Sequence, residues 1–210
     1  MYTEITEKYQ KQRIAIAKTI KELLPYFGWD HQLISEAEAV CGFDQGYCWL
    51  LFGKEIANII QFYENWHDQL MIDLLNLQES TTKIQVRQMI SNALKIRIKS
   101  CDFQVNMKKN QLYFLKPENY TLGSKLAWQT CNKIWYYAGD RSIDFNYYTK
   151  RGLLFPVYVS SINYYLYDQS DQHQKTDQFI DQALAKIINI ASLKNKIPKF
   201  ENIPILRLFL

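Results

Sequence analysis

Glu64 and His67 are the two residues that come nearest to catalytic chemistry, because an E-x-x-H spacing on a helix aims two ligands at one metal ion. A carboxylate-bridged di-iron site needs this motif twice, together with two further helical glutamates. The other histidines, His31 and His173, have no glutamate three residues before them. We therefore expect no metal site, and we expect His67 to lie on a helix surface.

Motifs of nucleophilic and nucleotide-dependent catalysis are missing: the sequence contains no G-x-S-x-G, no P-loop and no G-x-G-x-x-G. The cysteines form no C-x-x-C pair, so we expect neither a zinc site nor a disulfide framework. They are Cys41, Cys48, Cys101 and Cys131. We expect a protein that is not an enzyme, with no catalytic residue and no cofactor, in a reducing compartment of the cytosolic type.

The composition is that of a helical protein with a sizeable core. Of 210 residues, 48% are hydrophobic and 22% charged, and only seven are glycine and five proline, which argues against disorder and turn-rich β architectures. No apolar run reaches the ~18 residues that a membrane span requires. Residues 1–25 have the pattern of neither a signal nor a transit segment. We expect a cytoplasmic protein, peripheral to the inner membrane of a bacterial-type cell.

Hydrophobic residues recur at helical spacing along almost the whole chain, and no strand-like segment competes. Asp30 predicts the N-cap of a short helix over 31–40, which Gly42 closes. Further helices are expected over 44–52, 54–74, 125–138, 153–167 and 179–190, after a first one that ends near Pro25. The spacing predicts about nine helices in one all-α domain.

The first three expected helices, one long and two short, resemble in their layout the DNA-binding part of TetR-type transcription regulators. The segment in the place of the recognition helix, 44–52, contains Asp44 and no basic residue. From Gly28 to Ile60, five acidic residues stand against one lysine, a net charge of −4, which would repel the phosphates of DNA. We expect the layout to be kept and DNA binding to be lost, so no nucleic acid is expected as a partner.

Residues 153–167 differ from the other helices because they are apolar or aromatic nearly all round. Such a helix is enclosed by protein, and it could either wall a ligand cavity or simply fill the core. Two tryptophans share one face of the preceding helix. The residues expected to line a cavity are Trp128, Trp135, Leu154, Phe155, Tyr158, Val159 and Ile162.

Two further segments suggest contact with a membrane or an acidic partner. Between Lys83 and Lys116, eight basic residues stand against Asp102 alone, a net charge of +7. The interleaved apolar residues predict helices with one buried and one basic face, which either is solvated or attracts anionic lipid. The tail over 197–210 is strongly apolar from Ile203 onward and either folds back on the domain or touches a membrane.

A dense motif precedes the central helix. It has the form G-D-x-S-x-D-F-N-x-Y-T-K-R from Gly139 to Arg151 and resembles the signature of the ubiquinone (coenzyme Q) biosynthesis auxiliary family, a lipid-binding branch of the TetR-like fold. The resemblance implies a TetR-like domain whose apolar cavity binds isoprenoid quinone precursors. It also implies that the protein presents them to the di-iron demethoxyubiquinone hydroxylase and forms a homodimer through its last two long helices.

On this resemblance, 1–53 is a vestigial helix-turn-helix part, 54–196 a helical lipid-binding part and 197–210 an apolar tail, and the cavity residues contact lipid. Asp140 and Asp144 are expected to form the loop and N-cap of the central helix, which places the following residues on its first exposed turns. The expected partner-binding residues are Asp140, Asp144, Tyr147, Tyr148, Lys150 and Arg151. Tyr147 stands where the family usually has Trp, and Pro156 predicts a kink.

Two alternatives stay open at this point. A TetR-type transcription regulator that responds to a small apolar effector would need a DNA operator and a salt-dependent affinity for it. A membrane-peripheral scaffold without a ligand would differ from a lipid carrier only in whether the cavity is occupied.

Overall fold

The computed structural model describes residues 2–78, 85–100 and 103–194, and within these ranges all regular structure is helical. The prediction of an all-α fold is confirmed for this part of the chain. The α-helices are α1 (Tyr2–Leu23), α2 (His31–Val40), α3 (Tyr47–Phe52), α4 (Ile56–Leu77), α5 (Val86–Lys95), α6 (Gln104–Phe114), α7 (Tyr120–Tyr137), α8 (Phe145–Tyr165) and α9 (Gln174–Lys194). A π-helical turn, η1 (Ile96–Ser100), follows α5, and a 3-10 turn, η2 (Asp171–His173), precedes α9.

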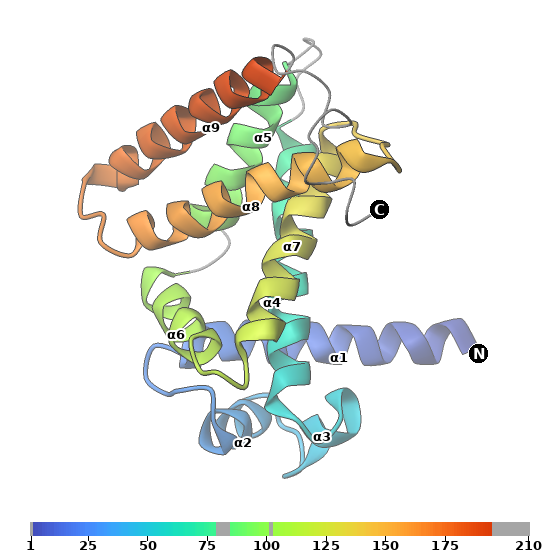
Figure 1. Ribbon diagram of the computed structural model, residues 1–210. Coiled ribbons are helices and arrows are strands. Elements are labelled where there is room, and N and C mark those ends of the chain that lie inside the picture. The colour runs from blue at the N-terminus through green and yellow to red at the C-terminus, as the bar shows by residue number, and fades with distance from the viewer. Residues whose placement is uncertain (1, 79–84, 101–102, 195–210) are drawn as a thin grey trace.

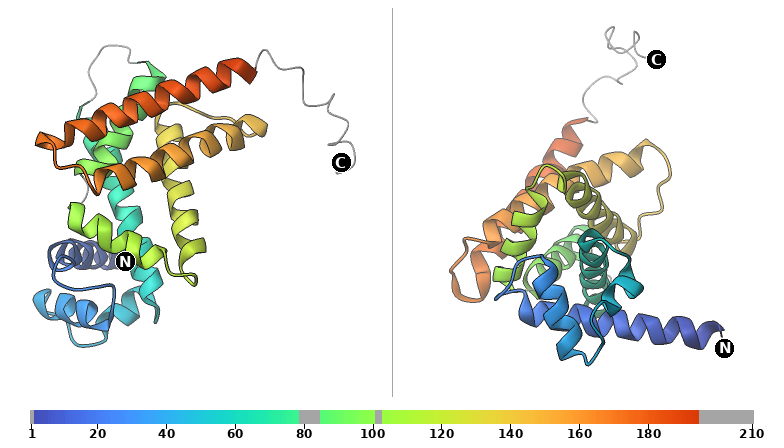
Figure 2. Two further views of the ribbon diagram at one scale, coloured as in Figure 1. Left: turned by 60° about the vertical axis from the view of Figure 1, so that its left-hand side comes forward. Right: turned by 90° about the horizontal axis from the view of Figure 1, so that it is seen from below.

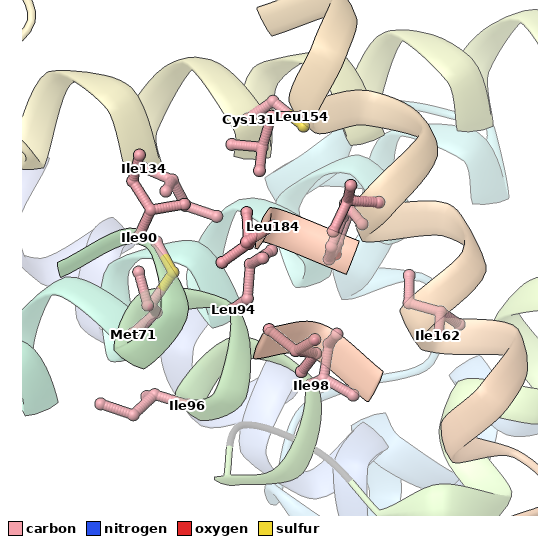
Figure 3. Close-up of a cluster of buried hydrophobic side chains, with 14 of the residues drawn as sticks. Met71, Ile90, Leu94, Ile96, Ile98, Cys131, Ile134, Leu154, Ile162 and Leu184 are labelled. Atoms are coloured by element: carbon pink, nitrogen blue, oxygen red, sulfur yellow. The ribbon is translucent and has the colours of Figure 1, made fainter. Parts of the chain in front are cut away.

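The helices form two layers that long helices connect (Figure 1). At one end α1, α2, α3 and the start of α4 bury a hydrophobic cluster that includes Ile16, Leu33 and Ile60. At the other end α5, η1, α7, α8 and α9 bury a second cluster with the far half of α4 (Figure 3). α8 and α9 lie side by side in every view (Figure 2). Since α4 contributes Tyr63 to the first cluster and Met71 to the second, it fixes the distance between the two layers.

Capping groups set the ends of the helices that frame the later sites. The side chain of Asp30 accepts a hydrogen bond of 3.0 Å from the backbone N–H of Leu33, and α2 begins at the predicted residue. Asp144 accepts one of 3.0 Å from the N–H of Asn146, as expected for the N-cap of the central helix. α8 therefore begins well before the apolar run that indicated it in the sequence. Gly139, with φ +89°, follows the end of α7 and turns the chain away.

Pro156 lies inside α8, which is one helix from Phe145 to Tyr165. The missing N–H of a proline leaves the carbonyl four residues earlier without its helical donor. That residue is Gly152, and both residues are exposed. Water can therefore hydrate the free carbonyl on the outer side of the helix.

A buried ionic cluster joins α4, η1 and α7. Arg97, in the π-helical turn, donates from Nε to Oδ1 of Asp68 at 2.8 Å and from a terminal nitrogen to Glu64. Thr130 on α7 donates to the same Oδ1 at 2.9 Å, and Nζ of Lys133 lies 3.0 Å from Oδ2 of Asp68. Burial raises the pKa of Glu64, although the guanidinium of Arg97 opposes this effect. One arginine thus compensates two carboxylates that lie one turn apart on α4.

The same cluster extends to α6 and the N-terminal layer. Nδ2 of Asn110 donates to Glu64 at 2.7 Å, and its Oδ1 accepts a hydrogen bond of 2.8 Å from the indole nitrogen of Trp29. Trp29 also packs edge-on against Tyr63, with ring centroids 5.3 Å apart. A continuous polar chain therefore runs from the α1–α2 connection through α6 to the ionic cluster.

His67 is fully buried, so the prediction that it lies on a helix surface is wrong. Its ring packs edge-on against Tyr63 at 4.2 Å and lies 4.8 Å from the ring of Trp66. The helical spacing missed this because α4 is covered on more than one side, and no single apolar stripe marks its buried face. Among the described residues, no group of three or more His, Cys, Asp or Glu side chains could hold a metal ion.

We expect Arg97→Met to lower the free energy of unfolding by about 3–5 kcal/mol, because the change leaves Glu64 buried without its cation and Asp68 with Lys133 alone. Urea unfolding followed by circular dichroism measures this loss. Lys11→Met is the control, because Lys11 pairs with Glu7 on the surface of α1 and should change stability by less than ~0.5 kcal/mol. Equal stability of the two variants would contradict the role of the cluster.

Candidate functional site

An apolar groove with a volume of about 310 Å³ lies between α6, α7 and α8. Its floor is made by hydrophobic side chains of α8 and small residues of α7, and its rim by longer side chains of α6. The lining residues are Lys108, Gln111, Leu112, Phe114, Leu115, Tyr120, Gly123, Ser124, Ala127, Phe155, Val159, Ile162, Asn163, Leu166 and Tyr167. The size falls at the lower end of the range of about 300–1,000 Å³ found for small-molecule pockets.

Gly123 allows α6 to approach α7 closely enough to close one side of the groove. A Cβ atom at this position would lie 2.8 Å from Cβ and Cγ of Phe114. Only glycine therefore fits here without a shift of the neighbouring side chain. Ser124 and Ala127 add little bulk on the same helix, and the space they leave is the groove.

The seven predicted cavity residues fall into three sets: groove residues, core residues and the two tryptophans of α7. Phe155, Val159 and Ile162 line the groove. Leu154 and Tyr158 lie in the hydrophobic core and are not among the residues that line this groove. α8 therefore both lines the groove and fills the core, the two roles that its all-round apolar sequence left open.

The two tryptophans of α7 are not among the residues that line the groove. The ring centroid of Trp128 lies 6.5 Å from that of the groove residue Phe155. The indole nitrogen of Trp135 donates to the backbone carbonyl of Lys150 at 3.0 Å and holds the first turns of α8 against α7.

The residues of α6 that line the groove, chiefly Leu112 and Leu115, were not among the predicted cavity residues. Their segment was interpreted only as a basic face with its apolar side buried. The sequence did contain a signal, because apolar and lysine residues alternate there without a clear helical stripe, but periodicity alone does not say which of them face outward.

A second candidate feature is the signature loop, residues 139–144 between α7 and α8. Asp140 lies at its centre, with Oδ1 2.6 Å from Nζ of Lys150 and Oδ2 2.8 Å from a terminal nitrogen of Arg151. The hydroxyl of Ser142 donates to the same carboxylate at 2.6 Å. Burial opposes ionisation, but the hydrogen bonds from Lys150, Ser142 and Arg151 hold the pKa of Asp140 well below its usual range.

Arg151 is 2% exposed, so the expectation that it lies on an exposed turn is wrong. Its Nε donates to Asn132 at 2.8 Å, and its guanidinium stacks 3.7 Å from the ring centroid of Tyr147. Asp140 of the loop, Asn132 of α7 and Tyr147 of α8 surround the guanidinium, an arrangement that the motif does not reveal. Asp140 is buried for the same reason, and Asp144 serves as the N-cap.

The outer surface of this region is hydrophobic. Tyr148 is 63% exposed, as predicted for the first turns of α8, and Ile143 and Phe145 beside it are still more exposed. The last two were not among the predicted partner residues, although large apolar side chains in a polar loop are the sign that marks them. Lys150 is half-buried, with its ammonium turned toward Asp140.

The basic segment is largely neutralised where it lies in α5 and η1. Lys95 and Lys99 pair with Asp181 and Asp177 of α9 at 2.8 and 2.7 Å, and Arg97 is buried. The prediction that these helices turn a basic face outward is wrong for these three residues, because acids distant in sequence pair with them. Lys83, Asp102, Cys101 and the tail over 197–210 lie outside the described residues.

In the part of the chain that the structure describes, no helix has the length and hydropathy needed to cross a bilayer. Of the acids in the segment from Gly28 to Ile60, Glu38 is buried and accepts hydrogen bonds from the backbone N–H groups of Gly46 and Cys48. Four acids of the segment remain exposed, namely Asp30, Glu36, Asp44 and Glu55.

We expect Asp140→Asn to lower stability at neutral pH and to lose this effect in acid. The folded pKa lies below the unfolded value of ~3.9, so the carboxylate contributes stability that is fully present above the unfolded pKa and is lost as the pH falls through the folded pKa. Thermal unfolding of the wild type and the variant across a pH series measures the difference. Asp144→Asn is the control, because asparagine caps a helix about as well as aspartate. A stability difference that persists unchanged into strong acid would contradict this origin.

A crystal structure of a TetR transcriptional regulator from Nitrosomonas europaea resembles the fold, with a TM-score of 0.65 and 17% sequence identity over 85% of this chain and 98% of that one. The TetR-like fold expected from the sequence is therefore confirmed. A family model described as COQ9 matches residues 120–191, which span α7, the signature loop, α8 and most of α9.

Curated relatives carry the same description. The chain is 27% identical to the probable ubiquinone biosynthesis protein coq9, mitochondrial, of Dictyostelium discoideum, over 88% of this chain and 62% of that protein. It is 22% identical to the human ubiquinone biosynthesis protein COQ9, mitochondrial, over 88% and 59%, and 25% identical to the protein of that name from Xenopus tropicalis, over 89% and 60%. The chain thus spans about 60% of the length of these relatives.

These names correct one expectation. The prediction of a cytoplasmic protein at the inner membrane of a bacterial-type cell is wrong, because the relatives are named as mitochondrial proteins. It rested on the first residues of a chain that matches only part of its relatives, and these residues carry no information on targeting. The family resemblance predicted from the motif between Gly139 and Arg151 is confirmed: the chain is similar to the COQ9 proteins of ubiquinone biosynthesis.

Proposed function

We propose that the chain is a non-catalytic lipid-binding protein of mitochondrial ubiquinone biosynthesis. It binds an isoprenoid quinone precursor in the groove between α6, α7 and α8 and presents it to the demethoxyubiquinone hydroxylase. The observation that carries the proposal is that the COQ9 match over 120–191 includes two of the three groove helices and the whole signature loop. In this account residues 1–53 are the vestigial helix-turn-helix part, 54–196 the lipid-binding part and 197–210 an apolar tail.

The chemistry of the groove supports an isoprenoid ligand. Phe155, Val159 and Ile162 offer an apolar wall to a methyl-branched chain, whose burial is favourable at about 25 cal/mol per Å² of apolar surface. Gln111 and Ser124 lie among the lining residues and can hydrogen-bond the oxygens of a quinone head group. The protein then holds and orients the lipid, and the chemical step takes place on the hydroxylase.

The hydrophobic surface beside the signature loop supports a protein partner. Tyr148, Ile143 and Phe145 are exposed next to one another in sequence, and interface hot spots favour aromatic anchors of this kind. The buried pair of Asp140 and Arg151 acts by tying the loop that carries Ile143 to the start of α8, which carries Phe145 and Tyr148. Tyr147 stacks on Arg151 from the same turn and belongs to this support. A homodimer through α8 and α9 is part of the proposal by analogy with the fold.

The alternative of a DNA-binding regulator is less well supported. The resemblance to a TetR regulator is one of fold, at 17% identity. α3 carries the sequence YCWLLF, and the exposed charges nearby on Glu36, Asp44 and Glu55 repel phosphate. A mobility shift with genomic DNA fragments separates the two accounts, because only the regulator gives a salt-sensitive complex.

We expect Val159→Asp to reduce the isoprenoid lipid that copurifies with the protein by about tenfold or more, because the ionised carboxylate would stand unpaired in the apolar wall of the groove. Solvent extraction followed by mass spectrometry measures the bound lipid. Asn76→Asp is the matched control, because it adds the same charge at an exposed position of α4 that does not line the groove. Undiminished lipid in a folded Val159→Asp protein would place the ligand elsewhere.

We expect Tyr148→Ala to weaken binding to the demethoxyubiquinone hydroxylase by about tenfold, the effect of removing one aromatic hot spot. Pull-down or calorimetry with the purified hydroxylase measures the affinity. Tyr26→Ala removes a still more exposed tyrosine from the connection after α1 and should leave the affinity unchanged. Identical affinities for all three proteins would remove Tyr148 from the interface. Arg151 is unsuitable for this test because its removal would unfold the loop.

A further inference from the structure

A second pocket lies where the N-terminal layer meets α4, away from the apolar groove. Its volume is about 340 Å³, and residues of α1, α3 and α4 line it. Figure 1 shows the place where α1 crosses α4, with α3 just below the crossing, and the two long helices are in contact. The lining residues, none of which lines the groove, are Arg13, Phe52, Asn58, Gln61, Phe62 and Asn65. The size is that of a small-molecule pocket.

α4 turns a polar strip toward this pocket. Four of the lining residues recur at the spacing i, i+3, i+4 and i+7, which places them on one face of the helix. They are Asn58, Gln61, Phe62 and Asn65. Three of the four carry side-chain amides, and each amide can both donate and accept hydrogen bonds. The pocket therefore offers hydrogen-bonding groups where the groove offers chiefly an apolar wall.

Arg13 supplies the positive charge of the pocket and is the one charged residue among those that line it. Its Nε donates to the backbone carbonyl of Leu51 at 2.9 Å, and a terminal nitrogen donates to the same oxygen. The guanidinium also lies over the ring of Phe52, 5.5 Å from its centroid. A guanidinium has five N–H donors, so most of them remain available. Arg13 forms no ion pair with any residue whose position the structure describes.

The amides of the pocket are partly fixed and partly available. Nδ2 of Asn65 donates to the backbone carbonyl of Gln61 at 2.9 Å, and its Oδ1 accepts a hydrogen bond of 3.0 Å from Nζ of Lys133, so its orientation is set. The side-chain amides of Asn58 and Gln61 have no hydrogen-bond partner within the described ranges. Gly53, with φ +87°, brings the end of α3 close to Asn58, because a Cβ atom there would lie 2.9 Å from Nδ2 of that residue.

Phe52 and Phe62 form the apolar side of the pocket. Their rings pack edge-on, with centroids 5.3 Å apart, and a planar ligand ring can add to such a pair in an offset or edge-on arrangement. The pocket thus combines two aromatic rings and amides without hydrogen-bond partners with a guanidinium that no described acid neutralises. A few convergent polar groups beside aromatic side chains are typical of a site for a small molecule.

We propose that this pocket, here called the Arg13 pocket, binds a small aromatic anion, that is, a planar ring that carries a carboxylate or a phosphate group. Arg13 pairs with the anionic group, while Phe52 and Phe62 contact the ring. The amides of Asn58 and Gln61 hydrogen-bond the polar substituents of the ring. The inference does not rest on the proposed lipid-binding function, because the Arg13 pocket and the groove share no residue.

The acidic residues that oppose DNA binding do not line the Arg13 pocket. The exposed acids of the segment 28–60 are Asp30, Glu36, Asp44 and Glu55, and none of them belongs to the lining. Binding of DNA requires a surface that neutralises many phosphates at once. A single anionic group requires only one guanidinium at hydrogen-bond distance. The net charge of the segment therefore excludes a nucleic acid but allows a small anion.

Titration calorimetry of the full chain tests the proposal with two anions, para-hydroxybenzoate and AMP. Their uncharged counterparts are methyl para-hydroxybenzoate and adenosine. We expect at least one anion to bind, and its counterpart to bind at least about tenfold more weakly, because a hydrogen bond to a charged group is lost. Arg13→Gln should abolish this difference, since the variant lacks the cation. Asn58→Leu should weaken binding of the anion about fivefold, the effect of losing one hydrogen bond.

Asn76→Leu is the matched control, because it makes the same substitution at an exposed position of α4 outside the Arg13 pocket. It should bind the anion like the wild type. Circular dichroism shows whether Arg13→Gln is folded, since Arg13 also ties α1 to the end of α3. If that variant unfolds, the two probe pairs on the wild type and the comparison of Asn58→Leu with Asn76→Leu decide the question.

The two anions distinguish the source of the ligand. Binding of para-hydroxybenzoate alone identifies an aromatic carboxylic acid, and binding of AMP alone identifies a nucleotide, and either result supports the proposal. It is overturned if neither anion shows saturable binding, if an anion and its uncharged counterpart bind equally, or if Asn58→Leu loses no more affinity than Asn76→Leu. None of these titrations contains an isoprenoid, so a failure of the lipid-carrier function leaves their outcome unchanged.

Discussion

The arrangement of this protein depends on the neutralisation of two carboxylates inside a hydrophobic core. Glu64 and Asp68 lie one turn apart on α4, the helix that both hydrophobic clusters share, and Arg97 reaches both of them. Since an unpaired buried charge is far more costly than a buried pair, α4 and η1 have to meet at this point. The π-helical turn that carries Arg97 continues α5 toward α4, and such turns often mark places where sequence and packing are in tension.

The same cluster determines the shape of the candidate lipid site. Through Asn110 it holds the inner side of α6, so a polar contact takes the position that apolar packing would normally occupy. The leucines of α6 then face outward, next to α8, and the small residues of α7 leave space between the helices. The polar contacts of Asn110 on the inner side of α6 thus leave its apolar side chains free to line the groove. Local choices that conflict with the general rules of folding are expected at functional positions.

The signature loop and the first turns of α8 contain two kinds of residue: those that hold the local structure in place and those that form its outer surface. Asp140, Ser142 and Arg151 turn inward and bond one another, whereas Ile143, Phe145 and Tyr148 turn outward. One motif of closely spaced residues therefore contains both the hydrogen-bonded residues that hold the local structure and the exposed hydrophobic residues at its surface. The low pKa of Asp140 reflects this frame, since hydrogen bonds from three side chains favour the charged form.

The sequence by itself determined the helices, because spacing and caps are local: Asp30 and Asp144 act as predicted, and the motif at 139–151 identified the family resemblance. Only the tertiary structure decided which side of each helix is covered. His67, Arg97 and Arg151 are buried by segments distant along the chain, and α8 divides its apolar residues between core and groove. Leu112 and Leu115 became site residues because Asn106, Met107 and Asn110 occupy the inner side of α6. Whether a side chain is buried depends on which other helix packs against it, and the hydrophobic pattern of one helix does not say which helix that is.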